Sequence, residues 1–358
     1  MPRVRITLRD ASSADGRTPG LDVSKLGLQD RGDGGGVPEL AASMQRSAGC
    51  WLKVLTLPYV SGAFEWSGFD YKGEPVPNNW PDVNSHFGFL DIAGFLKERG
   101  YWQKVWLANP EPPEIHMFPH WNWAADDDGG SKGHLAPCAG LCASSSVGPP
   151  NVTVFAFSNV PDGMIELLRN GERVGNATVG FGGWFSMVVP YAAGTLTARA
   201  YRANETKSVA QTSVTTTGAP ASLRASIKDG VGADGIVADG TDVALVMVEV
   251  LDSAGRVVPT ADSVITFSVS NQQIRGAVAQ IIGTGNGNPS SHTPDKSLIR
   301  EAFNGLALAV VQSVAGAAPP SPSATVRSVT VTVSSPGLDG GSVDIGLLPV
   351  SDPGISRL

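Results

Sequence analysis

The sequence predicts a mainly β protein, and three observations carry this prediction. From Asn151 onward, short runs of apolar and β-branched residues alternate with turn signals, which is typical of antiparallel strands. The chain of 358 residues contains 43 glycines and 26 prolines, which favours many turns. Hydrophobic residues make up 42% and charged residues only 16%, so the chain can bury enough apolar surface to fold. We expect two consecutive immunoglobulin-like β-sandwiches, preceded by one β/α unit.

The composition changes along the chain and indicates five segments. The early part lacks any long periodic apolar run, and the stretch between the β/α unit and the strands is low in complexity and predicted to be flexible. The predicted segments are a disordered or unmatched stretch at 1–40, the β/α unit at 41–109, a first sandwich at 110–217 with a flexible insert at 124–150, a second sandwich at 218–350 and a tail at 351–358.

The β/α unit begins with a continuous apolar run from Pro58 to Tyr71, which predicts a parallel-sheet strand buried on both faces. A loop rich in proline and asparagine follows, and FGFLDIAGFLKERGYW predicts a helix of two to three turns that ends at Gly100. The stretch from about 41 to 123 is crowded with tryptophan, which indicates either a heavy core or a stacking surface. Seven of the eight tryptophans lie there: Trp51, Trp66, Trp80, Trp102, Trp106, Trp121 and Trp123.

The strands of the first sandwich are predicted in VTVFAFSN, IELLRNGERVG, GWFSMVVPY and GTLTARAYR, with Asn170 and Gly171 as a type I′ hairpin turn. The second sandwich is predicted from DVALVMVEVLDSAGRVV, SVITFSVS, LALAVVQSVAG and ATVRSVTVTVSS. Within the second sandwich, between SVITFSVS and LALAVVQSVAG, the segment GTGNGNPSSH at 283–292 is rich in glycine but lacks the Lys-Ser/Thr ending of a phosphate-binding loop. We expect a loop that connects two strands.

Charge and hydropathy exclude several classes of partner. The net charge of −7 and the absence of a basic cluster argue against nucleic acid. A run of about 18 apolar residues is absent, as is a signal peptide, so no membrane partner is expected. The location in the cell stays open. If the full protein is secreted, the sequons at Asn151, Asn176 and Asn204 would lie on the first sandwich.

Cysteine and histidine patterns give no strong site. His134, Cys138 and Cys142 have a spacing that metal ligands can have, but a fourth ligand at a zinc-site interval is missing. Free thiols or one local disulfide explain them more simply, and we expect neither a metal nor another cofactor. GxSxG and HExxH are also absent, which argues against a serine hydrolase and a zinc protease.

Carboxylates near the end of the predicted strand are the remaining chemical candidates. A pair of Asp or Glu side chains can hydrolyse a glycoside, and Glu65, Asp70 and Glu74 lie in this region. The alternative is that each is an ordinary loop charge or accepts hydrogen bonds from backbone N–H groups. Trp66 is more informative, because an indole ring offers a flat apolar wall to the C–H face of a sugar.

The run GAFEWSGFDYKGEPVPNNWPDVNSHFGFLDIAGFLKERGYW resembles the eighth barrel strand and last helix of glycoside hydrolase family 2 enzymes of the β-galactosidase type. The resemblance continues through PEIHMFPHWNW, IELLRNGERVG, VPYAAGTLTARAY, TTGAPASL and GNGNPSSHTPDKSLIREAFNGLALAVVQS to SSPGL, and covers about residues 56–340. It implies a retaining exo-glycosidase that acts on a terminal sugar, usually a β-galactoside. Trp66 would line the subsite of that sugar, with Asp70, His86 and Lys97 nearby.

The chain departs from this family at the catalytic glutamates. The family has both on earlier barrel strands, whereas the only glutamate before Glu65 here is Glu39, in a context without a preceding strand. We therefore assign no catalytic residue and expect the incomplete remnant of a (β/α)8 barrel, its last strand and helix, ahead of the sandwiches. We expect a C-terminal fragment of a glycosidase that is inactive alone. The alternatives are a carbohydrate-binding or structural module, or one chain of a split enzyme with the missing barrel in another chain.

An isolated barrel strand has a physical problem. A (β/α)8 barrel takes about 250 residues and closes only with all eight strands. A strand that is apolar on both faces and lacks neighbours exposes apolar surface and two unpaired edges. We therefore expect the remnant to be poorly ordered, to pack on the first sandwich, or to need another chain.

Overall fold

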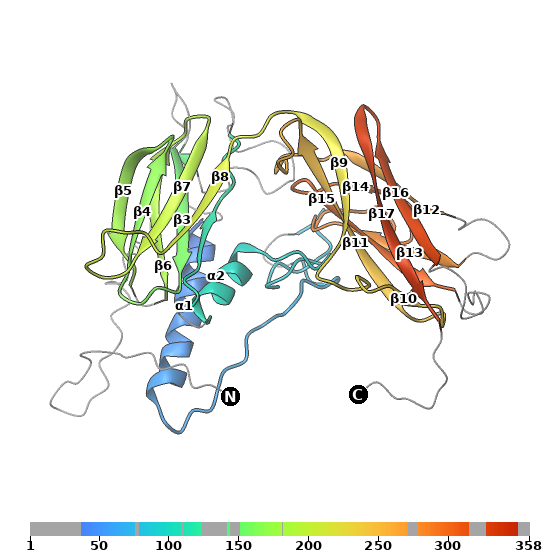
Figure 1. Cartoon of the computed structure of the whole chain (residues 1–358). Coiled ribbons are helices and arrows are strands. Elements are labelled where there is room, and N and C mark those ends of the chain that lie inside the picture. The colour runs from blue at the N-terminus through green and yellow to red at the C-terminus, as the bar shows by residue number, and fades with distance from the viewer. Residues whose placement is uncertain are drawn as a thin grey trace. The chain divides into compact units, whose positions relative to one another are not determined.

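The protein is described by a computed structural model, and it divides into two compact units by its internal contacts. The first unit comprises Met1–Phe69, Phe87–Leu90 and Leu96–Thr216, and the second comprises Asp70–His86, Asp91–Phe95 and Thr217–Leu358. Within them the structure describes residues 37–75, 79–108, 111–123, 142–143, 151–180, 182–270, 278–314 and 327–349. The prediction of a mainly β fold with β-sandwiches is confirmed (Figure 1). The predicted domain boundaries and the barrel remnant stay predictions.

The first unit contains two four-stranded antiparallel sheets. One has the order β1 (Ile115–Phe118), β3 (Asn151–Ser158), β2 (Cys142–Ala143), with β6 (Trp184–Pro190) also paired to β3. The other has the order β5 (Glu172–Thr178), β4 (Met164–Arg169), β7 (Thr195–Tyr201), β8 (Ala210–Thr215). The predicted hairpin turn joins β4 to β5, where Asn170 and Gly171 both have positive φ, 52° and 86°. That prediction is confirmed.

Strand β3 is buried on both faces, because two hydrophobic clusters share it. Successive side chains of a strand point to opposite faces. Val152, Val154 and Ala156 belong to the cluster between the sheets, together with Ile165 and Leu167 of β4. Phe155 and Phe157 belong to a second cluster. Its other buried members come from two helices, α1 (Val37–Thr56) and α2 (Glu98–Trp106): Met44, Ala48, Trp102 and Val105.

Both helices differ from the prediction. Helix α1 begins at Val37, inside the segment predicted to be disordered or unmatched. Helix α2 begins at Glu98 and runs through Gly100, where the predicted helix ends. Residues 91–95 form a turn instead, because the side chain of Asp91 accepts hydrogen bonds from the amides of Ala93 and Phe95. Such local bonds compete with helix formation, so the helix starts only after the turn.

The predicted strand from Pro58 to Tyr71 is wrong. Apart from single bridges of Phe69 to Leu90 and of Lys72 to Asn84 around its end, this region pairs with no strand among the described residues. Tyr59 and Phe64 are 81% and 106% exposed. A β-strand needs neighbours to satisfy its N–H and C=O groups, and a both-faces-buried strand needs them on two edges. The apolar composition of this segment alone therefore does not produce a strand.

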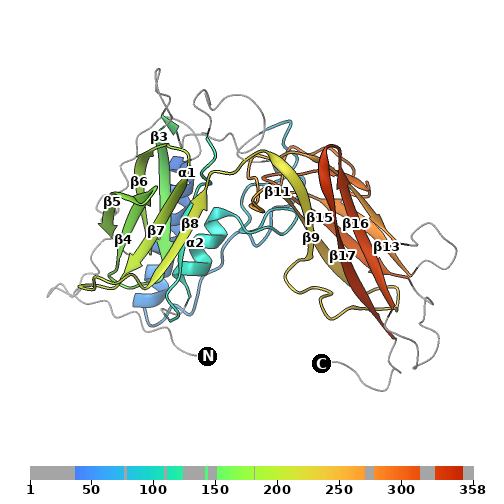
Figure 2. The same cartoon turned by 45° about the horizontal axis from the view of Figure 1, so that its top comes forward.

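The second unit is a β-sandwich built from nine strands. One sheet has the order β13 (Ala279–Gly285), β15 (Leu306–Ser313), β11 (Val243–Asp252), β9 (Pro220–Ile227). Through the parallel pairing of β9 with β17 (Leu338–Leu348) at Ser222 and Asp339, it continues into the other layer, β17, β16 (Arg327–Ser335), β12 (Val264–Val269), β14 (Ile299–Glu301), with β10 (Ile236–Val237) also paired to β17. Figure 2 shows β16 and β17 side by side, as their antiparallel register requires. Alternate residues of β11 and β12 are buried and form the core between the sheets.

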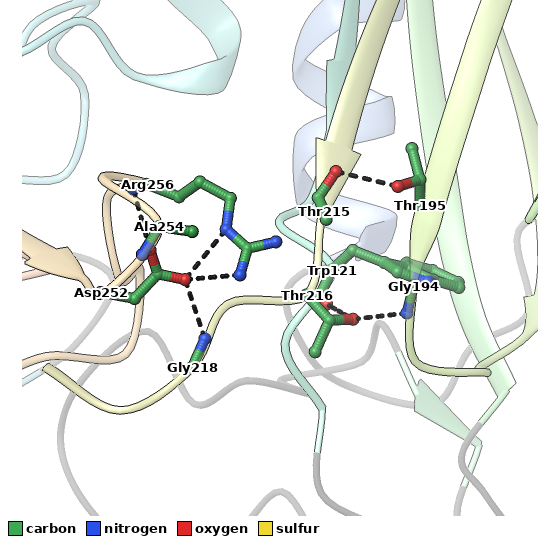
Figure 3. Close-up of polar contacts among 9 residues, drawn as sticks. All are labelled: Trp121, Gly194, Thr195, Thr215, Thr216, Gly218, Asp252, Ala254 and Arg256. Atoms are coloured by element: carbon green, nitrogen blue, oxygen red, sulfur yellow. Dashed lines mark hydrogen bonds and ion pairs between the residues drawn. The ribbon is translucent and has the colours of Figure 1, made fainter.

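Residues 216–218 connect the units, and each end is fixed on its own side (Figure 3). In the first unit, the hydroxyl of Thr216 donates to the carbonyl of Trp121 at 2.7 Å and accepts from the amide of Gly194 at 3.1 Å. In the second unit, the amide of Gly218 donates to a carboxylate oxygen of Asp252 at 2.9 Å. Asp252 also accepts from the guanidinium and amide of Arg256, and these bonds hold the pKa of its carboxyl well below the usual range.

Several predicted features lie outside the described residues. They are residues 1–36, most of the insert at 124–150, the tail at 351–358, and two of the three possible metal ligands, His134 and Cys138. Cys142 lies in β2, and Cys50 is a free, exposed cysteine. Across the part of the chain that the structure describes, neither helix is both long and apolar enough to cross a membrane.

Candidate functional site

Trp66 is an exposed aromatic side chain in the first unit. The residue is 71% exposed, and the peptide bond to Ser67 is cis. Three aromatic neighbours in sequence, Tyr59, Phe64 and Phe69, are also exposed. Four exposed aromatic side chains thus lie within residues 59–69.

The backbone around Trp66 is fixed by Arg99 of α2. Its guanidinium forms an ion pair with Glu65 at 2.6 Å and donates to the carbonyl oxygens of Trp66 at 3.4 Å and Phe87 at 3.2 Å. Ser47 of α1 adds a hydrogen bond to the same carboxylate oxygen of Glu65 at 3.0 Å. The side chains of Arg99 and Glu65 are only 18% and 14% exposed. An exposed indole therefore stands next to a buried polar network that holds its main chain.

Lys97, the second predicted site residue of the first unit, occupies the N-terminal cap position of α2. Its amide donates to the carbonyl of Phe89 at 2.8 Å, and its carbonyl accepts from Tyr101 at 2.9 Å. Its side chain makes no capping hydrogen bond. The backbone of Lys97 thus joins the helix to residues 87–90.

Asp70 and His86 lie at the two ends of the segment 70–86, in the second unit. Asp70 is buried, with 9% exposed. The two arms of the segment are joined by hydrogen bonds from the Ser85 amide to the Tyr71 carbonyl at 2.8 Å and from the Gly73 amide to the Val83 carbonyl at 2.9 Å. The two arms of the segment are thus hydrogen-bonded to each other, and one predicted site residue lies at each end.

His86 is held by a carboxylate. Its Nε2 lies 2.8 Å from Oδ2 of Asp82, and the other carboxylate oxygen of Asp82 accepts a short hydrogen bond from the hydroxyl of Ser290. An ionised carboxylate only accepts hydrogen bonds, so Nε2 of His86 is the donor in this contact. This arrangement links a predicted site residue to the loop between β13 and β14 of the sandwich.

The four predicted residues are thus described as two pairs: Trp66 and Lys97 in the first unit, and Asp70 and His86 in the second. Their part in a sugar site stays a prediction. Sequence reasoning missed Arg99, Ser47 and Ser290, which act through residues far away in sequence. The spacing of Asp82 and His86, four residues apart, was a visible signal, but on a loop it has no fixed geometric meaning.

The carboxylates considered for glycoside chemistry have structural partners. Glu65 is paired with Arg99, and Glu74 accepts a hydrogen bond from the Tyr71 hydroxyl at 2.5 Å. Within the described residues, no group of three or more His, Cys, Asp or Glu side chains is arranged to hold a metal ion. These residues therefore add no second site to the region of Trp66.

The described residues of each unit also line a cavity. A groove of about 450 Å³ in the first unit runs along α2 and is lined mainly by apolar side chains, among them Phe89, Leu90, Leu96 and Leu107. A cavity of about 410 Å³ in the second unit is lined by Lys72, Asn84, Ile92 and Ala93 on one side and by strands β13 and β15 on the other. Its polar walls include Lys72, Asp295 and Arg300, and Lys72 and Asp295 form an ion pair at 2.6 Å.

Two histidines of the first unit are kept neutral by burial. Burial and, to a lesser extent, the nearby charge of Lys104 together lower the pKa of His116 to about 4. Burial also lowers the pKa of His120 to about 4. The His116 ring stacks on Tyr101 at 3.9 Å, and Nδ1 of His120 accepts from the Asn122 amide at 3.1 Å. Both act as core residues.

Comparisons with known proteins agree with this architecture. The family model described as glycoside hydrolase family 2 C-terminal domain 5 matches residues 231–344, in the second unit. The β-galactosidase BoGH2A of Bacteroides ovatus is 32% identical over 257 residues, which cover 71% of this chain and 26% of that protein. A putative β-glucuronidase of Formosa agariphila is 33% identical over 263 residues, covering 71% of this chain and 22% of that protein.

A solved structure of a β-glucuronidase from glycoside hydrolase family 2 is similar as well. It shares 25% sequence identity with a TM-score of 0.64, and the match covers 88% of this chain and 28% of that one. The chain thus spans about a quarter of the length of the curated relatives it matches. Fold, sequence and family model agree that this chain is a C-terminal region of glycoside hydrolase family 2 type.

Proposed function

We propose that the chain is the C-terminal part of a retaining exo-β-glycosidase, and that Trp66 forms a wall of the subsite for the terminal sugar. Asp70, His86 and Lys97 contribute further contacts to this sugar, a β-galactoside in the first place. The observation that carries the proposal is Trp66 itself: an exposed indole on a main chain that a buried ion pair holds in place. The likeness of 71% of the chain to a β-galactosidase supports it.

The chemistry of an indole wall fits a sugar. One face of a pyranose ring presents C–H groups, which pack on an aromatic ring, while its hydroxyls need polar partners. Sugar binding on a preformed wall loses little entropy to ordering of the protein, because Arg99 and Glu65 already fix the backbone. The polar residues at 70, 86 and 97 follow Trp66 in the sequence and supply hydrogen-bonding side chains.

The catalytic glutamates belong, in this proposal, to a part of the enzyme outside these 358 residues. Retaining glycosidases use two carboxyl groups about 5 to 5.5 Å apart, one as acid/base and one as nucleophile. Glu65 is engaged with Arg99 and Ser47, which suits a structural role. The chain alone should therefore be inactive.

The exposed apolar surface of the first unit supports a covering polypeptide, which we identify with the rest of the barrel. Tyr59, Phe64, Trp66 and Phe69 are all more than half exposed. Monomeric proteins rarely leave large apolar surfaces open to water. The covering barrel can be contiguous with this chain or come from a second chain, and the experiment below includes both arrangements.

The test is a kinetic comparison of Trp66→Ala with wild type in the assembled enzyme, made either as one longer polypeptide or by mixing this chain with a separate barrel. A lost sugar wall should raise KM for a chromogenic β-galactoside, and kcat/KM should fall by about tenfold to a hundredfold. A β-glucuronide is assayed in parallel, because relatives of both kinds match the chain.

Val188→Ala is the control, since it removes an exposed apolar side chain of β6 in the same unit, outside the segment that the barrel is proposed to cover. It should leave KM within about twofold of wild type. Equal kinetics for Trp66→Ala and wild type on both substrates would contradict the sugar-wall proposal.

A further inference from the structure

The loop between β13 and β14, residues 286–298, has a shape that its own side chains determine. The side-chain oxygen of Asn286 accepts from the Asn288 amide at 3.1 Å, and that of Asn288 accepts from the Ser290 amide at 2.9 Å. The amide group of Asn286 donates to the carbonyl of Glu301 at 2.8 Å. Such side-chain to backbone bonds fix consecutive turns. The connecting loop predicted from the sequence therefore has a conformation that its own side-chain hydrogen bonds fix.

Arg300 is the centre of this element. It is 2% exposed, and all five N–H donors of its guanidinium have acceptors. Nε donates to the Thr284 hydroxyl at 3.3 Å, and Nη2 donates to the carbonyls of Thr284 at 2.8 Å and Pro294 at 2.9 Å. Nη1 donates to the Ser291 hydroxyl at 3.2 Å and the Thr293 carbonyl at 3.0 Å. A planar fork with five satisfied donors holds both ends of the loop at once.

The tip of the loop binds the segment 70–86. The Pro289 carbonyl accepts from the Val83 amide at 2.8 Å, and the Ser290 hydroxyl donates to Asp82. The ring of His292 lies 4.5 Å from that of Trp80 and its Nε2 lies 2.9 Å from the Pro81 carbonyl. Four successive residues of the segment are thus contacted by three residues of the loop.

A close approach at Gly287 adds a further contact between the loop and residues 91–95. A Cβ atom at Gly287 would lie 1.9 Å from Oδ2 of Asp91. Asp91 cannot move away easily, because its Oδ1 accepts from the amides of Ala93 and Phe95. The loop therefore fits this turn only with a glycine at 287.

We propose that the β13–β14 loop is a positioning element for the sugar site, and that Arg300 and Ser290 are positioning residues for His86. Arg300 shapes the loop, Ser290 binds one oxygen of Asp82, and Asp82 binds His86 with the other. The proposal rests on the proposed function insofar as His86 contacts the sugar. Its structural part, the orientation of His86 by the sandwich, can be tested without any substrate.

The chemical consequence lies in the tautomer of His86. With Nε2–H donating to Asp82, Nδ1 is left as an acceptor in the neutral ring. A ring whose acceptor nitrogen is fixed in place can accept a hydrogen bond from a sugar hydroxyl in only one orientation. A loop in the C-terminal sandwich would thus determine the orientation of the sugar hydroxyl that His86, at the end of the segment, can bind.

The first experiment compares the 358-residue chain with Arg300→Met and Ser290→Ala by amide hydrogen exchange. Arg300→Met should raise the exchange rates of the Val83 and Gly73 amides by about tenfold or more, because it removes five hydrogen bonds of a buried cation from the loop. Exchange in β11 and β16 should stay within about twofold of wild type. Arg224→Met, which removes a half-exposed ion pair with Glu249 in the same sandwich, is the matched control.

The second measurement is the nitrogen chemical shift of the His86 ring by NMR, assigned with His86→Gln among the five histidines. Wild type should show the Nε2–H form, and Ser290→Ala should shift the ring signals toward a mixture of tautomers. Ser268→Ala, an exposed serine of β12, is the matched control and should leave them unchanged. A merely structural role of Ser290 would not move these signals, so the milder variant keeps the test valid if Arg300→Met fails to fold.

The proposal is overturned if His86 keeps its wild-type signals in Ser290→Ala, or if a folded Arg300→Met loses protection equally in β11, β16 and the segment 70–86. In the assembled glycosidase, Ser290→Ala should raise KM with kcat little changed. If the substrate-free measurements succeed while KM is unchanged, the sugar-binding role of His86 fails and the positioning role stands.

Discussion

At the scale of single residues, the account depends most on the buried ion pair beside Trp66. Arg99 contacts Glu65 directly and two carbonyls that belong to different parts of the chain, at Trp66 and Phe87. Removing one member of a buried pair leaves the other charge without compensation, which costs more than the pair itself contributes. Arg99 is therefore both a stabilising residue and the residue that holds the indole in place.

We predict that Arg99→Met lowers the free energy of unfolding by roughly 3 kcal/mol. Urea unfolding followed by circular dichroism measures it. Arg202→Met is the matched control, because its ion pair with Glu111 is largely exposed and should contribute less than about 1 kcal/mol. Equal stability of Arg99→Met and wild type would show that Glu65 finds another partner and that the network does not hold Trp66.

The two buried histidines predict a pH dependence of stability. Their folded-state pKa values, about 4, lie below the ordinary value of 6.5. Between these values the unfolded chain binds more protons than the folded one, so stability falls as the pH drops from about 6.5 to about 4. His116→Phe keeps the ring stack on Tyr101 and should make the fall in Tm over this range shallower than in wild type. An unchanged slope would contradict the assignment.

At the scale of elements, Gly100 decides how α2 packs. A Cβ atom at this position would lie 2.5 Å from the carbonyl oxygen of Phe89, a backbone atom that cannot swing aside. Gly49 of α1 offers the opposite case, because nothing lies within 4 Å of its Cβ position. The same substitution should therefore have opposite effects in the two helices.

We predict that Gly100→Ala destabilises the first unit by about 1 to 3 kcal/mol, the usual range for overpacking. Gly49→Ala should instead stabilise it by up to about 1 kcal/mol, since alanine is the better helix former. Thermal unfolding of both variants measures this. A stabilising effect of Gly100→Ala would mean that α2 does not rest on residue 89.

The elements also show where sequence reasoning succeeds. The Asn170–Gly171 turn and the strands predicted in DVALVMVEVLDSAGRVV and SVITFSVS are local signals, and the structure confirms them. The strand predicted at 58–71 is wrong, because a strand also needs partner strands and the local pattern does not specify them. Helix α2 begins later than predicted, because the side chain of Asp91 stabilises a turn in residues 91–95.

At the scale of the whole molecule, the sequence predicted the β-sandwich architecture and single residues of the candidate site, but not the contacts that hold them. Trp66 stands out by its residue type alone. Its supports, Arg99 and Ser47, and the link from Ser290 to His86, join positions separated by up to about 200 residues, and no local pattern encodes such distances. The family resemblance predicted the kind of protein, whereas only the structure connects the sandwich loop to the segment that follows Trp66.

The most direct test of the central claim is hydrolysis of a chromogenic β-galactoside, with a β-glucuronide in parallel, by the purified chain alone and by the chain joined to or mixed with a barrel that carries the two glutamates. The account predicts no hydrolysis by the chain alone and hydrolysis of at least one substrate by the assembled protein. Hydrolysis by the chain alone would contradict it, and Glu39, Glu65 and Glu74 would then have to be substituted one by one.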